Sequence, residues 1–187
     1  FIGKELTKDL NSKNTYTISL NYKKALDTDN HFFIDISNKT QLKKTLDSLK
    51  NKFKKINVYF LAGESSVERS LLNPKDSFDA SVIAFSNVID YLKDFESSLV
   101  YASSGSIYDS RNKDRFIEND TLYPPSPYAA SKYASEGLAL SYFEAFNLDI
   151  KIARIFSVYG EHMSRFFLYD LIKKINSGES SIVLKGN

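Results

Sequence analysis

Short apolar runs bounded by turn-forming residues recur along the chain, and stretches with an apolar residue at every third or fourth position separate them. The short runs are typical of buried strands, and the periodic stretches are typical of helices that pack on a sheet. The short runs predict strands at 16–20, 32–36, 57–61, 99–103, 150–156 and 181–184. The periodic stretches predict helices at 2–10, 39–54, 75–95, 127–146 and 164–176.

The alternation of strands and helices indicates strand-helix units stacked into one parallel sheet. We therefore expect an α/β fold with a doubly wound, Rossmann-like parallel sheet. No repeat, low-complexity segment or flexible linker divides the sequence, so residues 1–187 are expected to form one domain. The longest break, 109–127, lies between the two most informative motifs, and long loops in compact domains tend to be functional.

The composition excludes several kinds of site. The chain has no cysteine, and its two histidines, His31 and His162, lie far apart, so we expect no disulfide, no thiolate nucleophile and no metal site. A net charge of +2 gives no sign of a nucleic-acid partner. The sequence contains neither a run of about 18 apolar residues nor a secretory signal, so we expect a soluble, cytoplasmic protein with no membrane partner.

Two segments carry candidate chemistry. The run Val100-Tyr-Ala-Ser-Ser-Gly-Ser-Ile-Tyr108 ends a predicted strand in a serine pair, and Ser126-Pro-Tyr-Ala-Ala-Ser-Lys132 begins a predicted helix. Tyr128 and Lys132 lie four residues apart and therefore share a helical face. A nearby ammonium lowers the pKa of a phenol, so Tyr128 is a candidate acid/base and Ser104 a candidate donor to the substrate oxygen.

The Tyr-x-x-x-Lys spacing alone is weak, because Tyr169 and Lys173 repeat it. The context separates the two matches. Tyr128 follows a Ser-Pro helix start, lies 24 residues after Ser104 and precedes Glu136. We interpret Tyr128 and Lys132 as catalytic, and Tyr169 as a packing or surface residue.

These segments resemble the extended short-chain dehydrogenases/reductases, specifically the NAD-dependent epimerase/dehydratase family of UDP-glucose 4-epimerase-like nucleotide-sugar enzymes. The resemblance covers nearly the whole chain. It includes Phe1-Ile-Gly3 as the end of a glycine loop, Leu61-Ala-Gly-Glu-Ser-Ser-Val-Glu-Arg-Ser70 as the loop after the fourth family strand, and Arg154-Ile-Phe-Ser-Val-Tyr-Gly160 as the segment after the sixth.

The resemblance implies roles for single residues. Ser104, Tyr128 and Lys132 would be catalytic, with Tyr128 and Lys132 also near the nicotinamide ribose. Ser104, Ser106 and Ser157 would contact the nucleotide-sugar substrate. The remaining expected cofactor-binding residues are Gly3, Asn21, Asp35, Ile36, Leu61, Ala62 and Gly63. The resemblance also implies a first strand before Phe1, a substrate domain after Asn187, and a possible homodimer.

The cofactor is expected to be NAD or NADP. An acidic residue that would grip the adenosine ribose is due near Asn21, and Lys23 and Lys24 follow closely. The lack of a negative charge there favours tolerance of the 2′-phosphate of NADP. Two further departures, Ser81 and Ser157, stand where the family often has asparagine.

Several reactions remain open. An epimerase at sugar C4 and an NADPH-dependent 4-ketoreductase both fit the motifs, and a nucleotide-binding scaffold without turnover is the non-catalytic alternative. Gly105 and Ser106 stand where dehydratase-like sequences carry an acidic pair, which argues against water elimination. Hydrolysis by Ser103 or Ser104 is disfavoured, because the serine pair lacks a Gly-x-Ser-x-Gly context and neither histidine has an evident acidic partner.

Overall fold

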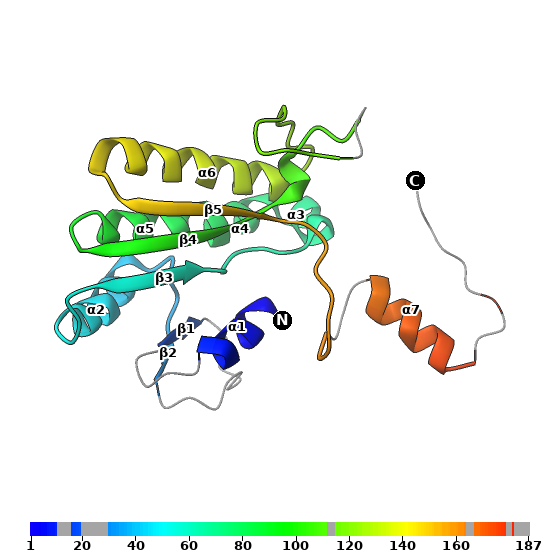
Figure 1. Ribbon diagram of the computed structural model, residues 1–187, viewed down its shortest axis with the longest axis horizontal. Helices are drawn as coiled ribbons and strands as arrows, with labels where there is room; N and C mark the ends of the chain where they lie inside the picture. Colours follow the sequence, from blue (N-terminus) through cyan, green and yellow to red (C-terminus); the bar gives the residue numbers. More distant parts are fainter. Residues whose placement is uncertain (11–15, 20–29, 112–114, 164–166, 179–180, 182–187) are drawn as a thin grey trace.

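The computed structural model describes residues 1–10, 16–19, 30–111, 115–163, 167–178 and 181. Its main sheet has three parallel strands in the order β3-β4-β5, namely β3 (Ile56–Phe60), β4 (Ser97–Ser104) and β5 (Asp149–Ile155). A second parallel pair consists of β1 (Thr17–Ser19) and β2 (His31–Phe33), as Figure 1 shows. Parallel neighbours need crossover connections, and helices lie in those between β3 and β4 and between β4 and β5.

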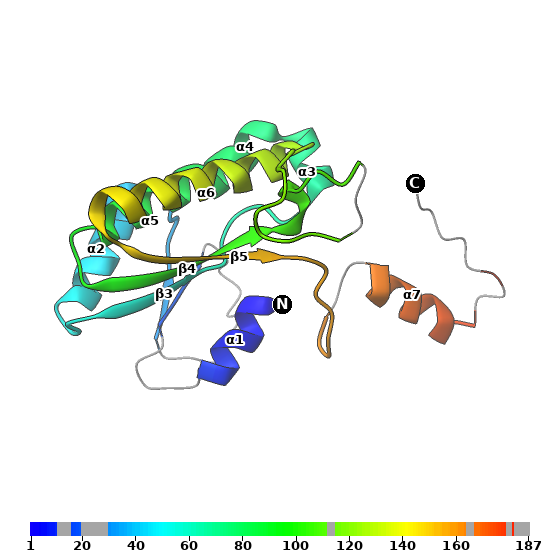
Figure 2. The same cartoon turned by 45° about the horizontal axis from the view of Figure 1, so that its top comes forward.

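Long helices lie on both sides of the main sheet. On one side are α2 (Lys39–Lys50), α5 (Ala84–Leu92) and α6 (Pro127–Phe146), whereas α1 (Ile2–Leu10) lies on the other side (Figure 2). No helix within the described ranges is long and apolar enough to cross a membrane.

Shorter segments connect these elements. Between β3 and α5 the chain forms α3 (Val67–Leu72), α4 (Pro74–Phe78) and η1 (Asp79–Ile83), a π-helical turn. The 3-10 turn η2 (Gly105–Ile107) follows β4 directly, and α7 (Phe167–Asn176) comes after β5.

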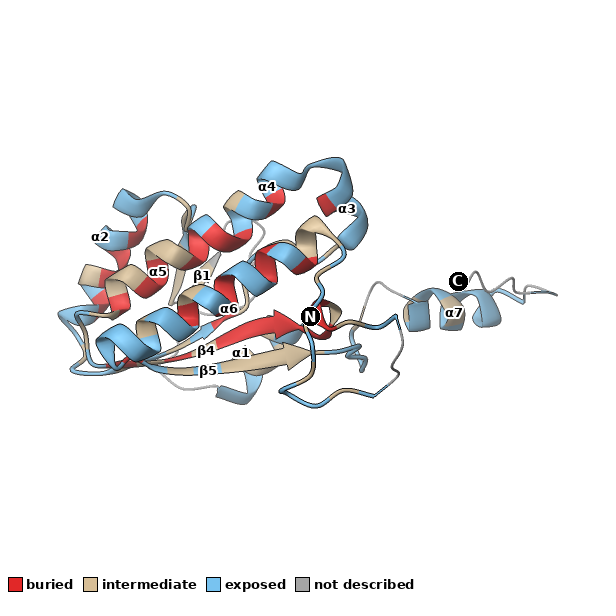
Figure 3. Cartoon of the chain, turned by 90° about the horizontal axis from the view of Figure 1, so that it is seen from above, coloured by how far each residue is buried: buried red, intermediate tan, exposed pale blue. Residues whose placement is uncertain are grey.

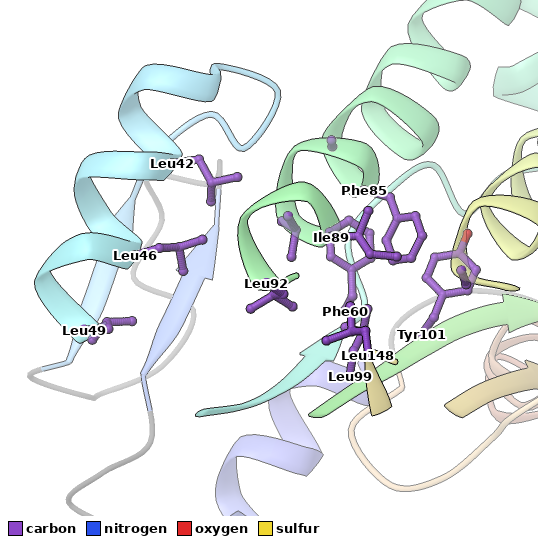
Figure 4. Close-up of a cluster of buried hydrophobic side chains, with 13 residues drawn as sticks. Leu42, Leu46, Leu49, Phe60, Phe85, Ile89, Leu92, Leu99, Tyr101 and Leu148 are labelled. Carbon is purple, nitrogen blue, oxygen red and sulfur yellow. The ribbon is translucent and has the colours of Figure 1, made fainter. Parts of the chain in front are cut away.

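The main core lies between the sheet and the helices α2 and α5 (Figure 4). Both helices supply apolar residues at steps of three or four, which puts each set on one helical face. These residues are Leu42, Leu46 and Leu49 on α2, and Phe85, Val88, Ile89 and Leu92 on α5. β4 is the most buried strand, as Figure 3 shows, and its core residues Leu99 and Tyr101 are 1% and 0% exposed. The core therefore fixes the strand that ends in Ser104.

The helix α6 has the predicted limits, and its ends explain why. The Ser126 hydroxyl accepts a hydrogen bond from the Ala129 amide at 3.2 Å, and Pro127 occupies the first turn, where its missing N–H costs nothing. At the other end Asn147 adopts a left-handed conformation with φ of 53°. Asparagine tolerates this conformation better than most residues, so the helix stops at Phe146.

Other predicted limits need correction. The helix expected at 39–54 ends at Lys50, because residues beyond Asn51 turn back and Phe53 packs against the core. The helix expected at 75–95 starts one residue earlier, includes η1 and ends at Leu92, because the chain must reverse before β4 begins at Ser97. The prediction missed α3, which begins at Val67 inside the expected loop.

The predicted strands at 16–20, 32–36, 57–61, 99–103 and 150–156 are confirmed with shifted ends. The structure has β2 ending three residues before its apolar run does, and β4 beginning two residues before its apolar run. The expected helix 164–176 is described from Phe167 onward. The expected strand 181–184 lies outside the described residues except for Ser181, which is not in a strand.

Candidate active site

Ser104 ends β4 and also begins the turn η2. Its hydroxyl accepts a hydrogen bond from the Ser106 amide at 3.2 Å and lies 2.9 Å from the Ser106 hydroxyl. Ser104 is 8% exposed, so hydrogen bonds within the turn, and not bonds to water, fix its side chain. The structure thus brings together two of the serines expected at the substrate.

Lys132 reaches the same end of β4 from α6. It is 5% exposed, its Nζ donates to the Ala102 carbonyl at 2.8 Å, and the same nitrogen lies 5.2 Å from the centre of the Tyr101 ring. Burial lowers the pKa of Lys132 to about 8, because the charged form is poorly solvated there. The lysine is therefore anchored two residues from Ser104.

Tyr128 lies one turn before Lys132, in the first turn of α6. Its backbone amide donates to the hydroxyl of Ser70 at 3.1 Å, and Ser70 is a fully buried residue of α3. This bond fixes the backbone of Tyr128 at the start of α6.

The second Tyr-x-x-x-Lys match has a different environment. Tyr169 and Lys173 lie on α7, where Lys173 is exposed and the helix has no buried residue. An exposed ammonium is screened by water and shifts a neighbouring phenol little. The two matches therefore differ in the burial of the lysine, which is 5% exposed at Lys132 and exposed at Lys173.

The expected cofactor loop follows β3. Gly63 has a φ of 119°, a conformation that favours glycine, and a Cβ at this position would lie 2.9 Å from the hydroxyl of Ser81. The Ser81 hydroxyl accepts a hydrogen bond from the Glu64 amide at 3.3 Å, and Ser81 is 1% exposed in η1. Ser81 therefore supports the loop 61–64, a role that the sequence did not indicate.

Gly3 is brought to the same loop from the start of α1. A Cβ on Gly3 would lie 3.5 Å from Cδ1 of Leu61, and the ring of Phe1 lies beside Gly160, after β5. The first turn of α1 thus lies next to the carboxyl end of β3. The start of a helix at this edge of the sheet is suited to a phosphate group.

Of the remaining expected cofactor residues, the structure describes Asp35 and Ile36 but not Asn21. Asp35 follows β2, where its carboxylate accepts from the amide and the hydroxyl of Ser37 at 2.9 and 2.6 Å. The carbonyl of Ile36 accepts from Asn87 at 3.3 Å. Asn21, Lys23 and Lys24 fall outside the described residues.

Arg154 connects three parts of the site, and sequence reasoning did not single it out. Its Nε and Nη2 bind the carboxylate of Glu136 on α6, at 2.8–3.2 Å. Its Nη1 donates to the Tyr108 hydroxyl at 2.8 Å and to the Glu118 carbonyl at 2.7 Å. Glu136 is 2% exposed, so this is a buried ion pair. Ser157, expected at the substrate, is exposed just beyond β5.

Comparisons with known proteins identify the family. The model of the NAD dependent epimerase/dehydratase family matches residues 1–187. The UDP-glucuronate 4-epimerase of Thermodesulfobacterium geofontis is 31% identical over 164 residues, which cover 84% of this chain and 50% of that protein. A dTDP-glucose 4,6-dehydratase of Streptomyces antibioticus is 33% identical over 106 residues, which cover 56% of this chain and 32% of that protein.

Solved structures show the same fold. The UDP-N-acetylglucosamine 4-epimerase from Methanobrevibacter ruminantium M1 superposes with a TM-score of 0.83 at 24% identity, over 98% of this chain and 62% of that one. The expected doubly wound, Rossmann-like fold is therefore confirmed. The chain spans about half or less of the length of the curated relatives named above.

Proposed function

The chain belongs to the NAD dependent epimerase/dehydratase family, and from this membership we propose that it is the nucleotide-binding part of a nucleotide-sugar 4-epimerase. The observation that carries the proposal is that buried Lys132 binds the Ala102 carbonyl two residues before Ser104, at the end of β4, with Tyr128 one helical turn from Lys132. Carboxyl ends of parallel strands are where such sheets bind ligands.

The residues around this edge fit a nicotinamide dinucleotide, which accords with the NAD dependence of the family. Gly63 has the positive φ that this loop needs, Gly3 lies beside Leu61 of the same loop, and the first turn of α1 would bring its amides to a pyrophosphate here. Leu61 and Ala62 would line the same loop. When bound, the cofactor supplies a hydride acceptor and donor for the sugar carbon.

The side chains at the end of β4 would then move and hold the proton. Ser104 donates to the oxygen on sugar C4, and Tyr128 takes the hydroxyl proton as the hydride leaves that carbon. Return of the hydride to the opposite face of C4, and of the proton to the oxygen, gives the epimer. The sugar is therefore neither oxidised nor reduced overall. With a pKa of about 8, Lys132 is mostly charged at neutral pH, one helical turn from Tyr128.

Epimerisation is favoured over dehydration, although a dehydratase is among the relatives. Loss of water needs one group to take the C5 proton and another to protonate the leaving hydroxyl. Gly105 and Ser106 supply neither. Asp109 is the nearest acid along the chain, but both its oxygens bind Arg111 at 2.8 Å, which lowers its pKa to about 2. Asp109 therefore carries no proton to donate near neutral pH.

The test is to incubate the full-length protein with UDP-glucuronic acid, UDP-glucose and UDP-N-acetylglucosamine, and to follow the products by NMR. We expect the 4-epimer from at least one substrate, without loss of water. Net consumption of NADPH with a 4-keto sugar would instead indicate a ketoreductase. Steady formation of a product lighter by one water would overturn the proposal.

The acid/base assignment has its own test. Tyr128→Phe keeps the ring but removes the proton-exchanging hydroxyl, so turnover is expected to fall at least about 100-fold, the usual range for a lost general acid/base. Tyr169→Phe is the matched control, because it removes the same atom from the exposed helix α7. Near-normal turnover of Tyr128→Phe would show that another group moves the proton.

A further inference from the structure

Position 105 has no room for a side chain, although its backbone conformation does not require glycine. Its φ is not in the positive range in which Gly63 and Gly178 lie. A Cβ at position 105, however, would lie 2.6 Å from Cδ1 and Cε1 of Phe156 and 2.7 Å from its Cζ. Real Cβ atoms essentially never approach other atoms so closely, so any side chain at 105 must displace the ring of Phe156.

The ring of Phe156 is held by two other rings. It stacks on Tyr108 and on Phe116 with centroids 6.1 Å apart in both cases and interplanar angles of 16° and 23°. Tyr108 and Phe116 stack on each other at 4.9 Å. Tyr108 is itself fixed, because it is 5% exposed and its hydroxyl accepts from Arg154. Moving Phe156 therefore breaks contacts that the rest of the site maintains.

The contact lies next to the proposed reacting group. Gly105 directly follows Ser104, and Phe156 comes one residue after the end of β5, the strand that pairs with β4. Phe156 is 56% exposed, so the ring covers Gly105 with one edge and offers the rest of its surface to whatever enters the site.

We propose that Phe156 is a specificity-determining residue, which fills the space beside Ser104 and keeps any side chain, and above all a carboxyl group, from position 105. The proposal rests on the proposed function for its chemical meaning. An acid at 105 would supply a proton to a leaving sugar hydroxyl, while a base takes the C5 proton and the sugar loses water. With Phe156 in place, the site is restricted to exchange of the hydride and the proton at one carbon.

The steric part is tested in the full-length protein by a double-mutant cycle read out as thermal midpoint, which needs no substrate. Gly105→Ala in the native background should lower the midpoint by about 3–10 °C, as overpacking does in a protein of this size. In the Phe156→Ala background the same change should lower it by less than about 1 °C. Gly105→Asp should show the same dependence on position 156. Equal losses in both backgrounds would overturn the proposal.

The chemical part is tested by mass spectrometry of UDP-glucose and dTDP-glucose incubated with two variants. Gly105→Asp/Ser106→Glu with Phe156 retained should give no dehydrated sugar, and the same pair combined with Phe156→Ala should give at least tenfold more of it. Equal yields, or no water loss from either variant, would limit Phe156 to packing and overturn the specificity assignment. If the native protein turns over no nucleotide sugar while the thermal coupling persists, the proposed function fails and the steric exclusion stands.

Discussion

Lys132 shows at the scale of one residue how burial prepares a group for chemistry. The ammonium has one backbone partner, the Ala102 carbonyl, and one aromatic neighbour, Tyr101, in a nearly dry environment. Desolvation makes the charged form less stable than in water, which is why the pKa falls to about 8. The same burial keeps the charge of Lys132 unscreened, so that its effect on a neighbouring phenol is larger than at the surface.

This burial predicts a pH dependence of stability. Below about pH 8 Lys132 is charged in both the folded and the unfolded chain, so the full burial cost is present. Between pH 8 and the unfolded value of 10.5, the folded chain loses this proton and the unfolded chain keeps it, so stability rises with pH, by up to about 3 kcal/mol. The free energy of unfolding of Lys132→Met, minus that of the native protein, should therefore be smaller at pH 10 than at pH 7.

Urea unfolding of both proteins at the two pH values measures this difference. Lys173→Met, on the exposed helix α7, is the control and should show no such change. A difference that does not vary with pH would mean that Lys132 is solvated in the native protein.

The sequence indicated some of these residues and not others, for a physical reason. Ser104, Tyr128 and Lys132 belong to contiguous motifs with local signals, a strand end and a helix cap. Ser70 supports the Tyr128 amide across 58 positions of the chain. Such a contact has no periodicity and no cap, so a single sequence gives no signal for it.

At the scale of elements, capping residues near its ends define the helix α6, whereas they do not define the helical segment from α4 to α5. The limits of α6 follow from Ser126, Pro127 and Asn147, whose preferences act within one turn. The segment from α4 to α5 changes to a π-helix over Asp79–Ile83, where Ser81 supports the loop after β3. The apolar pattern at 75–95 predicted one uniform helix. It gave no sign of the π-helical turn, because that turn depends on a tertiary contact and not on the helical period.

The Arg154–Glu136 pair links β5 to α6 and should dominate the stability of this junction. Arg154→Leu leaves the carboxylate of Glu136 buried without a partner, so we expect a loss of about 3–5 kcal/mol in free energy of unfolding. Arg154→Leu/Glu136→Leu removes both charges and should lose much less. Lys43→Met breaks an exposed pair with Asp47 and should cost at most about 1 kcal/mol.

Chemical denaturation of these variants, with native and single-variant proteins side by side, checks the prediction. A double variant as unstable as Arg154→Leu would show that the bonds of Arg154 to Tyr108 and Glu118, rather than its pairing with Glu136, hold the junction together.

At the scale of the whole molecule, the proposed site collects short segments from distant parts of the chain. Gly3 meets Leu61, Lys132 meets Ala102, and Phe156 meets Gly105. The resemblance of these segments to one family implied that Gly3, Leu61, Ser104 and Lys132 serve one site. The sequence could not give the partners of their side chains, which depend on how the layers pack.

A bound dinucleotide should therefore stabilise the whole protein by joining these segments. Ligand at about 100 times its dissociation constant adds about 2.7 kcal/mol to the stability of a protein that binds it only when folded. We predict that NAD raises the thermal midpoint of the full-length protein, and that NADP does so as well, because Asn21 carries no charge to repel its 2′-phosphate. Asn21→Asp should weaken the effect of NADP at least about tenfold in concentration and leave that of NAD nearly unchanged.

Calorimetric titration with both cofactors gives the dissociation constants directly. A native protein that binds NAD alone, with NADP rejected before any substitution at position 21, would show that other groups grip the adenosine ribose. It would also place Lys23 away from the cofactor.

The π-helical turn η1 has a consequence for how the length of this protein can vary. A π turn holds one residue more than the α-helical turn it replaces, so it absorbs an insertion without rotating the helix on either side. Losing one residue from Asp79–Ile83 would thus leave α4 and α5 on their present faces, and the core against α5 would be preserved. The amide of Glu64 would lose its hydrogen bond to the hydroxyl of Ser81. A single-residue deletion here should therefore leave the packing of the helices unchanged and alter only the loop after β3.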